Sequence, residues 1–186
     1  YWASQGGYYS IAKLLLEHGA DLNQKDNDDV SPLYCASKRG YLNIVRLLVE
    51  NDAKVNSLNI NHQTPLFCAC KGNQKQIAEY LIKQNADVNL RNNFGETPLF
   101  LAAENGHIYV VKLLCKNSCN VNEYNNEQKT PLFFAAKNGH SEIVKYLLDV
   151  GAKSNISDKY GRLPITMADR NDHMDTVKIL RQAFNP

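Results

Sequence analysis

The sequence has neither a long apolar run nor a strong excess of charge of one sign. Its 186 residues include 21 Lys and Arg against 19 Asp and Glu, which gives a formal net charge of +2. So small an excess does not support nucleic-acid binding, which calls for a concentrated basic surface. No apolar stretch is long enough to cross a bilayer. We therefore expect neither a nucleic-acid partner nor membrane insertion within these residues.

Cysteine is present, but without the spacing of a disulfide framework. The cysteines are Cys35, Cys68, Cys70, Cys115 and Cys119. This odd set favours a reducing compartment, and we expect an intracellular, cytoplasmic protein. The alternative is a zinc site that combines Cys68-x-Cys70 or Cys115-x3-Cys119 with His107 or His140. Neither spacing matches a usual structural zinc pattern, so we expect no metal.

Catalytic motifs are also missing from the sequence. It has no Gly-rich phosphate loop, no nucleophile elbow and no metalloprotease helix motif. The carboxylates are scattered as single residues. We therefore expect no enzymatic activity, no cofactor and no small-molecule substrate.

What the sequence does have is an internal period of 33 residues. The motifs that recur are Ser31-Pro32-Leu33, Thr64-Pro65-Leu66, Thr97-Pro98-Leu99, Thr130-Pro131-Leu132 and Leu163-Pro164-Ile165. A fixed period of this size indicates stacked structural repeats, each of which buries its apolar face against its neighbours. Such an architecture offers a long exposed surface and no enclosed pocket, and this favours the binding of another macromolecule.

Each repeat predicts two short helices. The hydroxyl residue suits an N-cap and the Pro suits the first helical position, so a first helix should begin at Pro32 and its counterparts. It should end at residues that tolerate left-handed backbone, namely Gly7, Gly40, Asn73, Gly106, Gly139 and Asp172. A second apolar stretch follows, for example at Ile108, Val111 and Leu114. Its ends should be Gly19, Asp52, Asn85, Ser118 and Gly151.

A polar stretch rich in Asn, Asp and Gly joins each pair of helices to the next and favours a turn. The repeat that begins Gly95-Glu96-Thr97-Pro98-Leu99-Phe100-Leu101-Ala102-Ala103-Glu104-Asn105-Gly106-His107 resembles the ankyrin repeat. The resemblance covers essentially the whole chain and implies an all-α ankyrin-repeat solenoid of helix-turn-helix units joined by hairpin-like turns. One departure recurs, because Tyr34, Phe67, Phe100 and Phe133 stand where the family usually has His. We expect an aromatic ladder between repeats in place of the family's Thr-to-His hydrogen bonds.

We expect a single domain over residues 1–186. The predicted repeats are 1–25, 26–58, 59–91, 92–124, 125–157 and 158–186. The first is partial, because Tyr1-Trp2-Ala3 occupies the phase of Tyr34-Cys35-Ala36, and we expect the chain to be a piece of a longer protein. The last, with Arg181 and Gln182 in its second helix, has the polar character of a terminal cap.

The resemblance implies a non-catalytic protein-protein interaction module, an adaptor or scaffold. Its partner would lie on a concave face formed by turn tips and first helices. The candidate partner-binding residues are Lys38, Arg39, Ile60, Lys71, Arg91, Phe94, Glu104, Tyr124, Lys129, Lys137, Tyr160, Arg162 and Arg170. Aromatic and Arg side chains are frequent interface anchors, and the basic residues favour an acidic or mixed peptide as the partner of a monomeric protein.

Two other interpretations stay open. The tip aromatics could pack on neighbouring turns while the basic residues form a solvated face. The function could instead be that of a mechanical or regulatory segment in a membrane channel or cytoskeletal tether, or that of a secreted pathogen effector.

The Asn residues that follow each second helix have two possible roles. Asn23, Asn56, Asn89, Asn122 and Asn155 recur in one phase, similar to ankyrin domains that are hydroxylated on Asn, and Asn89 is the first candidate. The alternative role, which accounts for all five at once, is that each side chain fixes its turn by bonding the backbone.

Overall fold

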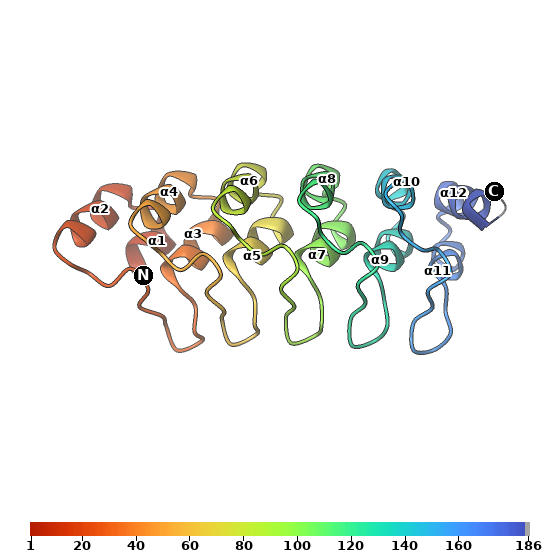
Figure 1. Cartoon of the computed structure of the whole chain (residues 1–186), viewed down its shortest axis with the longest axis horizontal. Coiled ribbons are helices and arrows are strands. Elements are labelled where there is room, and N and C mark those ends of the chain that lie inside the picture. The colour runs from red at the N-terminus through yellow and green to blue at the C-terminus, as the bar shows by residue number, and fades with distance from the viewer. Residues whose placement is uncertain (185–186) are drawn as a thin grey trace. The chain divides into compact units, whose positions relative to one another are not determined.

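A computed structural model describes residues 1–184, which form twelve helices and no strand (Figure 1). The chain divides into two compact units, Tyr1–Asn93 and Phe94–Pro186. The last two residues of the predicted repeat 158–186 lie outside the described residues. Among the described residues, no helix is both long and apolar enough to cross a membrane.

Unit 1 contains three pairs of helices. They are α1 (Trp2–Gly6), α2 (Tyr9–Glu17), α3 (Pro32–Arg39), α4 (Leu42–Glu50), α5 (Pro65–Lys71) and α6 (Lys75–Lys83). The first helices α1, α3 and α5 pack in sequence, and the second helices α2, α4 and α6 do the same. In Figure 1 the connecting loops extend below the first helices, and the second helices lie above them.

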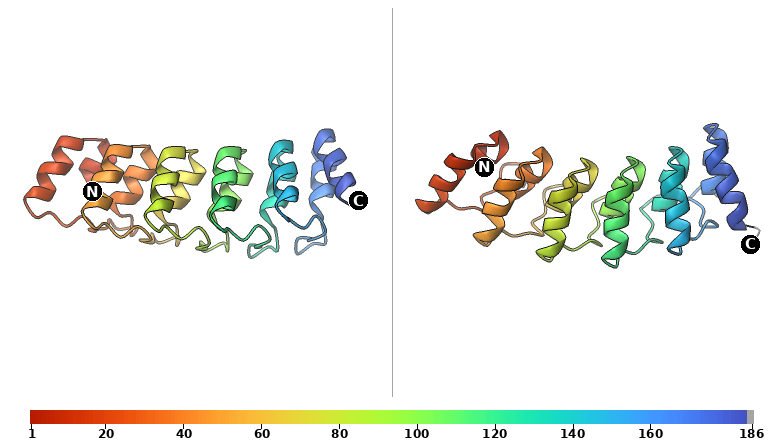
Figure 2. Two further views of the ribbon diagram at one scale, coloured as in Figure 1. Left: turned by 45° about the horizontal axis from the view of Figure 1, so that its top comes forward. Right: turned by 90° about the horizontal axis from the view of Figure 1, so that it is seen from above.

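Unit 2 repeats this arrangement. Its helices are α7 (Pro98–Glu104), α8 (Ile108–Lys116), α9 (Pro131–Lys137), α10 (Ser141–Asp149), α11 (Pro164–Arg170) and α12 (Met174–Phe184). The first helices α7, α9 and α11 pack in sequence, as do the second helices α8, α10 and α12. Figure 2 shows the paired helices of each repeat from two further sides. The predicted all-α architecture of repeated helix pairs is thus confirmed in both units.

The helix starts follow the Pro positions, as predicted. Pro32, Pro65, Pro98, Pro131 and Pro164 are the first residues of their helices. The Ser31 hydroxyl accepts a hydrogen bond from the Tyr34 amide at 3.1 Å, and Thr64 and Thr130 cap in the same way. The prediction is wrong for Thr97, whose side chain makes no capping bond. There the Phe100 amide donates to the Thr97 carbonyl at 3.0 Å instead.

The predicted helix ends are all in left-handed backbone. The residues that follow the first helices are Gly7, Gly40, Asn73, Gly106, Gly139 and Asp172, with φ from 54° to 84°. Those that follow the second helices are Gly19, Asp52, Asn85, Ser118 and Gly151, with φ from 61° to 95°. Both sets are confirmed, because each end depends mainly on the conformation of one residue.

The aromatic residues that replace the family's His form part of the core. Tyr34, Phe67, Phe100 and Phe133 are at most 8% exposed. In unit 2, Phe134 makes edge-to-face contacts with Phe100 at 6.0 Å and with Phe133 at 6.1 Å between ring centroids. The predicted aromatic ladder is wrong about which residues form it in unit 2. Among the described ring contacts, Phe134 touches Phe100, and Phe133 does not.

Five-residue tip loops are built around one Asx side chain each, a feature that the sequence analysis missed. In unit 1 these loops are 26–30 and 59–63, and in unit 2 they are 125–129 and 158–162. The Oδ1 atom of Asp26, Asn59, Asn125 or Asp158 accepts from the backbone amides two and four residues later, at 2.9–3.0 Å. The loops are therefore held in one conformation.

The Asn residues after the second helices link neighbouring repeats. Asn56 Oδ1 accepts from the Asp87 amide at 3.0 Å, and its Nδ2 donates to the Asn85 carbonyl. Asn122 bonds Lys153 and Gly151 in the same way. These contacts give Asn56 and Asn122 the structural role that accounts for all five positions, and hydroxylation, with Asn89 as its first candidate, stays the alternative.

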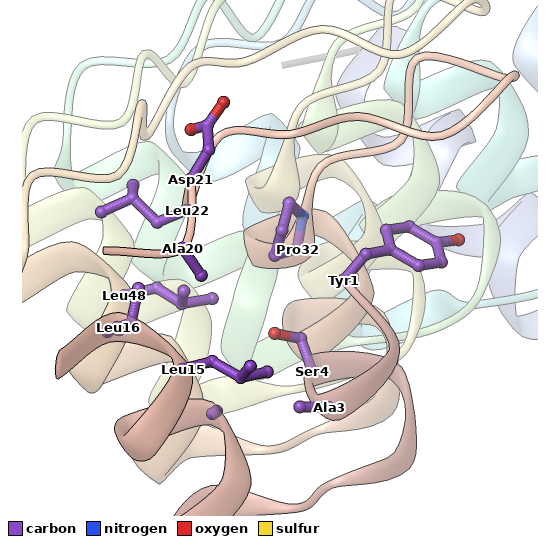
Figure 3. A pocket seen from close by; sticks show the side chains of 11 residues that line it. Tyr1, Ala3, Ser4, Leu15, Leu16, Ala20, Asp21, Leu22, Pro32 and Leu48 are labelled. Atoms are coloured by element: carbon purple, nitrogen blue, oxygen red, sulfur yellow. The ribbon is translucent and has the colours of Figure 1, made fainter. Parts of the chain in front are cut away.

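A small apolar cavity lies in unit 1. Leu15 and Leu16 of α2 line it together with Leu48 of α4 and Ser4 of α1, as Figure 3 shows. Its volume is about 40 Å³, far below the several hundred Å³ of a metabolite site. We interpret it as imperfect packing of the first helix pair.

Candidate protein-binding surface

The candidate residues of unit 1 lie on tip loops and at the ends of first helices, except Arg91, which lies in the segment between α6 and α7. Lys38 and Arg39 form the last turn of α3, and Lys71 ends α5. Ile60 lies on tip loop 59–63 and is 57% exposed. All three basic residues and Arg91 are exposed as well. We call the surface that the tip loops and the last turns of the first helices form, within each unit, the loop face.

Some candidate residues of unit 2 are exposed, and the others are half-buried. Phe94, Tyr124 and Tyr160 are 62%, 53% and 66% exposed. Lys137 and Arg170, which end α9 and α11, are exposed too. The half-buried candidates are Glu104, Lys129 and Arg162. Exposed aromatic side chains beside basic residues are the combination that the sequence predicted for a partner surface.

Backbone hydrogen bonds join successive tip loops within each unit. In unit 1 the Ile60 amide donates to the Asp28 carbonyl at 3.0 Å, and Asn93 donates to Asn61 at 3.1 Å. In unit 2 the Asn126 amide donates to the Phe94 carbonyl at 2.9 Å. These bonds recur in phase, so the tips form a row of fixed spacing. A partner that bound there would find the side chains already positioned, which reduces the entropy lost on binding.

Glu127 holds two of the lysines on the loop face of unit 2. Its carboxylate pairs with Lys129, whose side chain is 16% exposed, and with Lys159 at 3.1 Å. Hydrogen bonds from Lys129 and Lys159 keep the pKa of Glu127 below its ordinary value. The bond to Glu127 raises the pKa of Lys159. Lys129 thus contributes more to the order of its loop than to a charge available to a partner.

Arg162 is likewise tied to its own loop. Its Nε and Nη2 donate to Asp158 Oδ2 at 2.8 and 2.6 Å, and the Asp158 side chain is fully buried. Burial disfavours the charged form of Asp158, but the bonds from Arg162 and from two backbone amides outweigh it, and the pKa is lowered. The guanidinium also lies 4.8 Å from the centre of the Tyr160 ring. Tyr160 is therefore an exposed aromatic side chain held over a fixed cation.

A hollow of about 190 Å³ in unit 1 brings opposite charges together on the loop face. Asp26 and Asp28 line it from the tip loop, and Lys38 and Arg39 line it from α3. The structure thus unites the predicted bases with two acidic residues that the sequence analysis did not select. The periodic Asx position and the polar tip were the signals that could have identified them.

A second exposed surface, on α1 and α2, was also missed. Trp2 is 77% exposed, whereas Phe134 and Leu101 in the same repeat phase are at most 8% exposed. Ile11 and Leu15 are 51% and 45% exposed, although their counterparts in α4, α6, α8 and α10 are buried. Among the described residues, no helix pair lies on this side of α2 to cover them. Sequence periodicity identifies such positions as apolar but does not show whether a neighbour covers them.

Metal binding has no geometric support in the described residues, since no group of three or more His, Cys, Asp or Glu side chains is arranged to hold an ion.

Comparison with protein families matches the chain to a family described as ankyrin repeats (3 copies). The matched segments overlap and cover residues 1–59, 55–125, 85–158 and 117–185. No curated protein matches the chain.

Proposed function

Because the chain belongs to the ankyrin-repeat family, whose repeats generally serve as protein-protein interaction modules and are typically non-catalytic, we propose that it is an adaptor or scaffold. In each unit the loop face binds an extended segment of a protein partner. No cofactor or small-molecule substrate is needed for this function.

One observation carries the proposal. Phe94, Tyr124 and Tyr160 expose more than half of their surface. The Phe94 carbonyl accepts from the Asn126 amide, and the Lys159 amide beside Tyr160 donates to the Glu127 carbonyl at 3.0 Å, so backbone bonds hold the loops of Phe94 and Tyr160 in position. Large exposed side chains on a rigid support are suited to act as anchors, because burying them releases water while little conformational freedom remains to be lost.

The charges on the loop face indicate the chemistry of the partner. Lys137 and Arg170 of unit 2 favour acidic residues in the segment bound there. The hollow of unit 1, with carboxylates on one side and Lys38 and Arg39 on the other, favours a segment of mixed charge. Complementary charge of this kind mainly raises the association rate and the selectivity of binding.

The experiment compares capture of partners from a cell lysate by four forms of the protein. One variant reverses charge in unit 1 (Lys38→Glu with Lys71→Glu) and another in unit 2 (Lys137→Glu with Arg170→Glu). The matched control reverses exposed charges on second helices (Lys75→Glu with Lys145→Glu). We expect the same proteins with the unmodified chain and the control, and their loss with one or both loop-face variants. The proposal is contradicted if the control loses partners and the loop-face variants keep them.

A further inference from the structure

Two cysteine side chains meet at the end of helix α8 in unit 2. Cys115 lies in the last turn of α8, and Cys119 follows three residues after the helix. The Cys119 thiol donates to the Cys115 sulfur, with 3.5 Å between the two Sγ atoms. Both side chains are half-buried, so reagents in solution can approach them.

The helix end creates this contact. Ser118 has a φ of 61°, and the left-handed turn brings the Cys119 amide within 3.3 Å of the Leu114 carbonyl. This hydrogen bond closes a turn of six residues, from Leu114 to Cys119, and reverses the direction of the chain. The side chain of the residue that follows the left-handed one then lies against the last turn of the helix. The same bond closes the second helices α2, α4, α6 and α10. The juxtaposition of residues 115 and 119 is thus a fixed part of the repeat.

The two thiols are specific to this repeat. In the phase of Cys119 the four repeats that span residues 1–91 and 125–157 have Ala20, Ala53, Ala86 and Ala152. In the phase of Cys115 the same four repeats have Leu16, Val49, Ile82 and Leu148, and the last repeat has Arg181. The turn therefore folds with aliphatic side chains at both positions, and nothing in its packing calls for sulfur.

The other three cysteines lie in the core. Cys35, Cys68 and Cys70 are at most 8% exposed. Burial raises the pKa of all three thiols, which suppresses the reactive thiolate. At Cys115 the hydrogen bond from Cys119 has the opposite effect and lowers the pKa. These directions favour formation of the reactive thiolate at Cys115 over the three core cysteines.

We propose that Cys115 and Cys119 form a dithiol modification site, which low-molecular-weight disulfides of the oxidised-glutathione class convert to an intramolecular disulfide. The Cys115 thiolate attacks one sulfur of the small disulfide and releases one small thiolate. Cys119 then loses its proton and attacks Cys115 Sγ in the mixed disulfide, releasing the second small thiolate. The two cysteines are oxidised, the small disulfide is reduced to two thiols, and these take up the two protons.

The test is to treat the folded protein with oxidised glutathione, block the remaining thiols in denaturant and digest with trypsin. Lys112, Lys116 and Lys129 are cleavage sites, so Cys115 and Cys119 fall on separate peptides, 113–116 and 117–129. We expect mass spectrometry to find these peptides joined by a disulfide, with two thiols lost per chain. The proposal is overturned if both peptides carry the blocking group, or if each retains its own glutathione.

The matched variants are Cys119→Ala and Cys115→Leu, which place at each position a residue that other repeats have there. Both should fold with unchanged circular dichroism and form no linked peptide. Cys119→Ala should hold at most one glutathione, on Cys115. Equal loss of two thiols in the unmodified protein and in Cys119→Ala would assign the reaction to the core cysteines and overturn the proposal.

Discussion

The imidazole ring of His140 fills the space beside Gly106. A Cβ on Gly106 would lie 2.8 Å from the ring, and the ring Nε2 is 2.9 Å from the Glu104 carbonyl oxygen. His173 and Gly139 show the same relationship one repeat later. Each of these histidines thus ties the start of its second helix to the end of the first helix of the preceding repeat.

Gly106→Ala is therefore expected to destabilise the protein for two reasons. Gly106 has a φ of 76°, where a non-glycine residue costs about 1–2 kcal/mol, and the added Cβ meets His140. Gly161→Ala is the control, because its φ is 74° and no atom lies within 4 Å of a Cβ there. Urea unfolding should give a larger loss of unfolding free energy for Gly106→Ala. Equal losses would show that the His140 ring does not constrain this position.

Gln128→Gly is expected to stabilise the protein. Gln128 has a φ of 59°, in the phase where Gly95 and Gly161 occupy other loops, and it is exposed. Relief of the left-handed strain should raise the unfolding free energy by about 1 kcal/mol, partly offset by the greater freedom of unfolded Gly. Gln76→Gly in helix α6 should instead lower it by about 1 kcal/mol. A fall in stability for Gln128→Gly would contradict the assigned backbone conformation.

The buried serines of α3 and its N-cap should respond in opposite ways to Ala. Ser37 is fully buried, and its hydroxyl has no hydrogen-bond partner in the described part of the chain. Ser37→Ala should raise stability by about 1 kcal/mol, since Ala103 and Ala136 occupy the same phase. Ser31→Ala should lower it by about 1 kcal/mol through loss of the cap to Tyr34. Thermal unfolding of the two variants measures the direction of each change in stability. A loss of stability in Ser37→Ala would show that the Ser37 hydroxyl makes a stabilising hydrogen bond.

The ion pair of Asp158 and Arg162 predicts a loss of stability in acid. Because the folded pKa of Asp158 lies below its ordinary value of 3.8, its contribution is present above that value and disappears as the pH falls through the folded pKa. Asp158→Asn keeps an Oδ1 acceptor, as Asn59 and Asn125 do, but loses the charge. The variant should be less stable at neutral pH, with a flatter decline below about pH 4.

The control for this prediction is Asp149→Asn, which removes an exposed carboxylate of α10. Its curve of unfolding free energy against pH should run parallel to that of the unmodified protein. If the Asp158→Asn curve also runs parallel, the ion pair does not contribute to the pH dependence.

The sequence predicted those parts of the fold that depend on single residues. Pro98 begins its helix and Gly106 ends it, because each limits its own backbone. Side-chain contacts with a residue about one repeat away could not be predicted from the sequence. Glu127 pairs with Lys159, and Phe134 takes the ring contact expected of Phe133, through side-chain positions that no local pattern specifies.

The candidate site shows the same division. The exposure of Ile60 and Tyr160 follows from their place on a tip, and the sequence predicted it correctly. The burial of Lys129 beside Glu127 and the exposure of Trp2 depend on what lies next to them. The sequence predicted the helix end at Ser118 but not that the left-handed turn there brings the side chains of Cys115 and Cys119 together.

The most direct test of the loop face is site-specific photo-crosslinking to a captured partner. A benzophenone side chain would replace Tyr124 or Tyr160 on the loop face of unit 2, and Tyr109, exposed on α8, as the control. The account predicts crosslinks to the partner from the loop-face positions and none from Tyr109. Crosslinks from Tyr109 alone would contradict it and assign binding to the second helices.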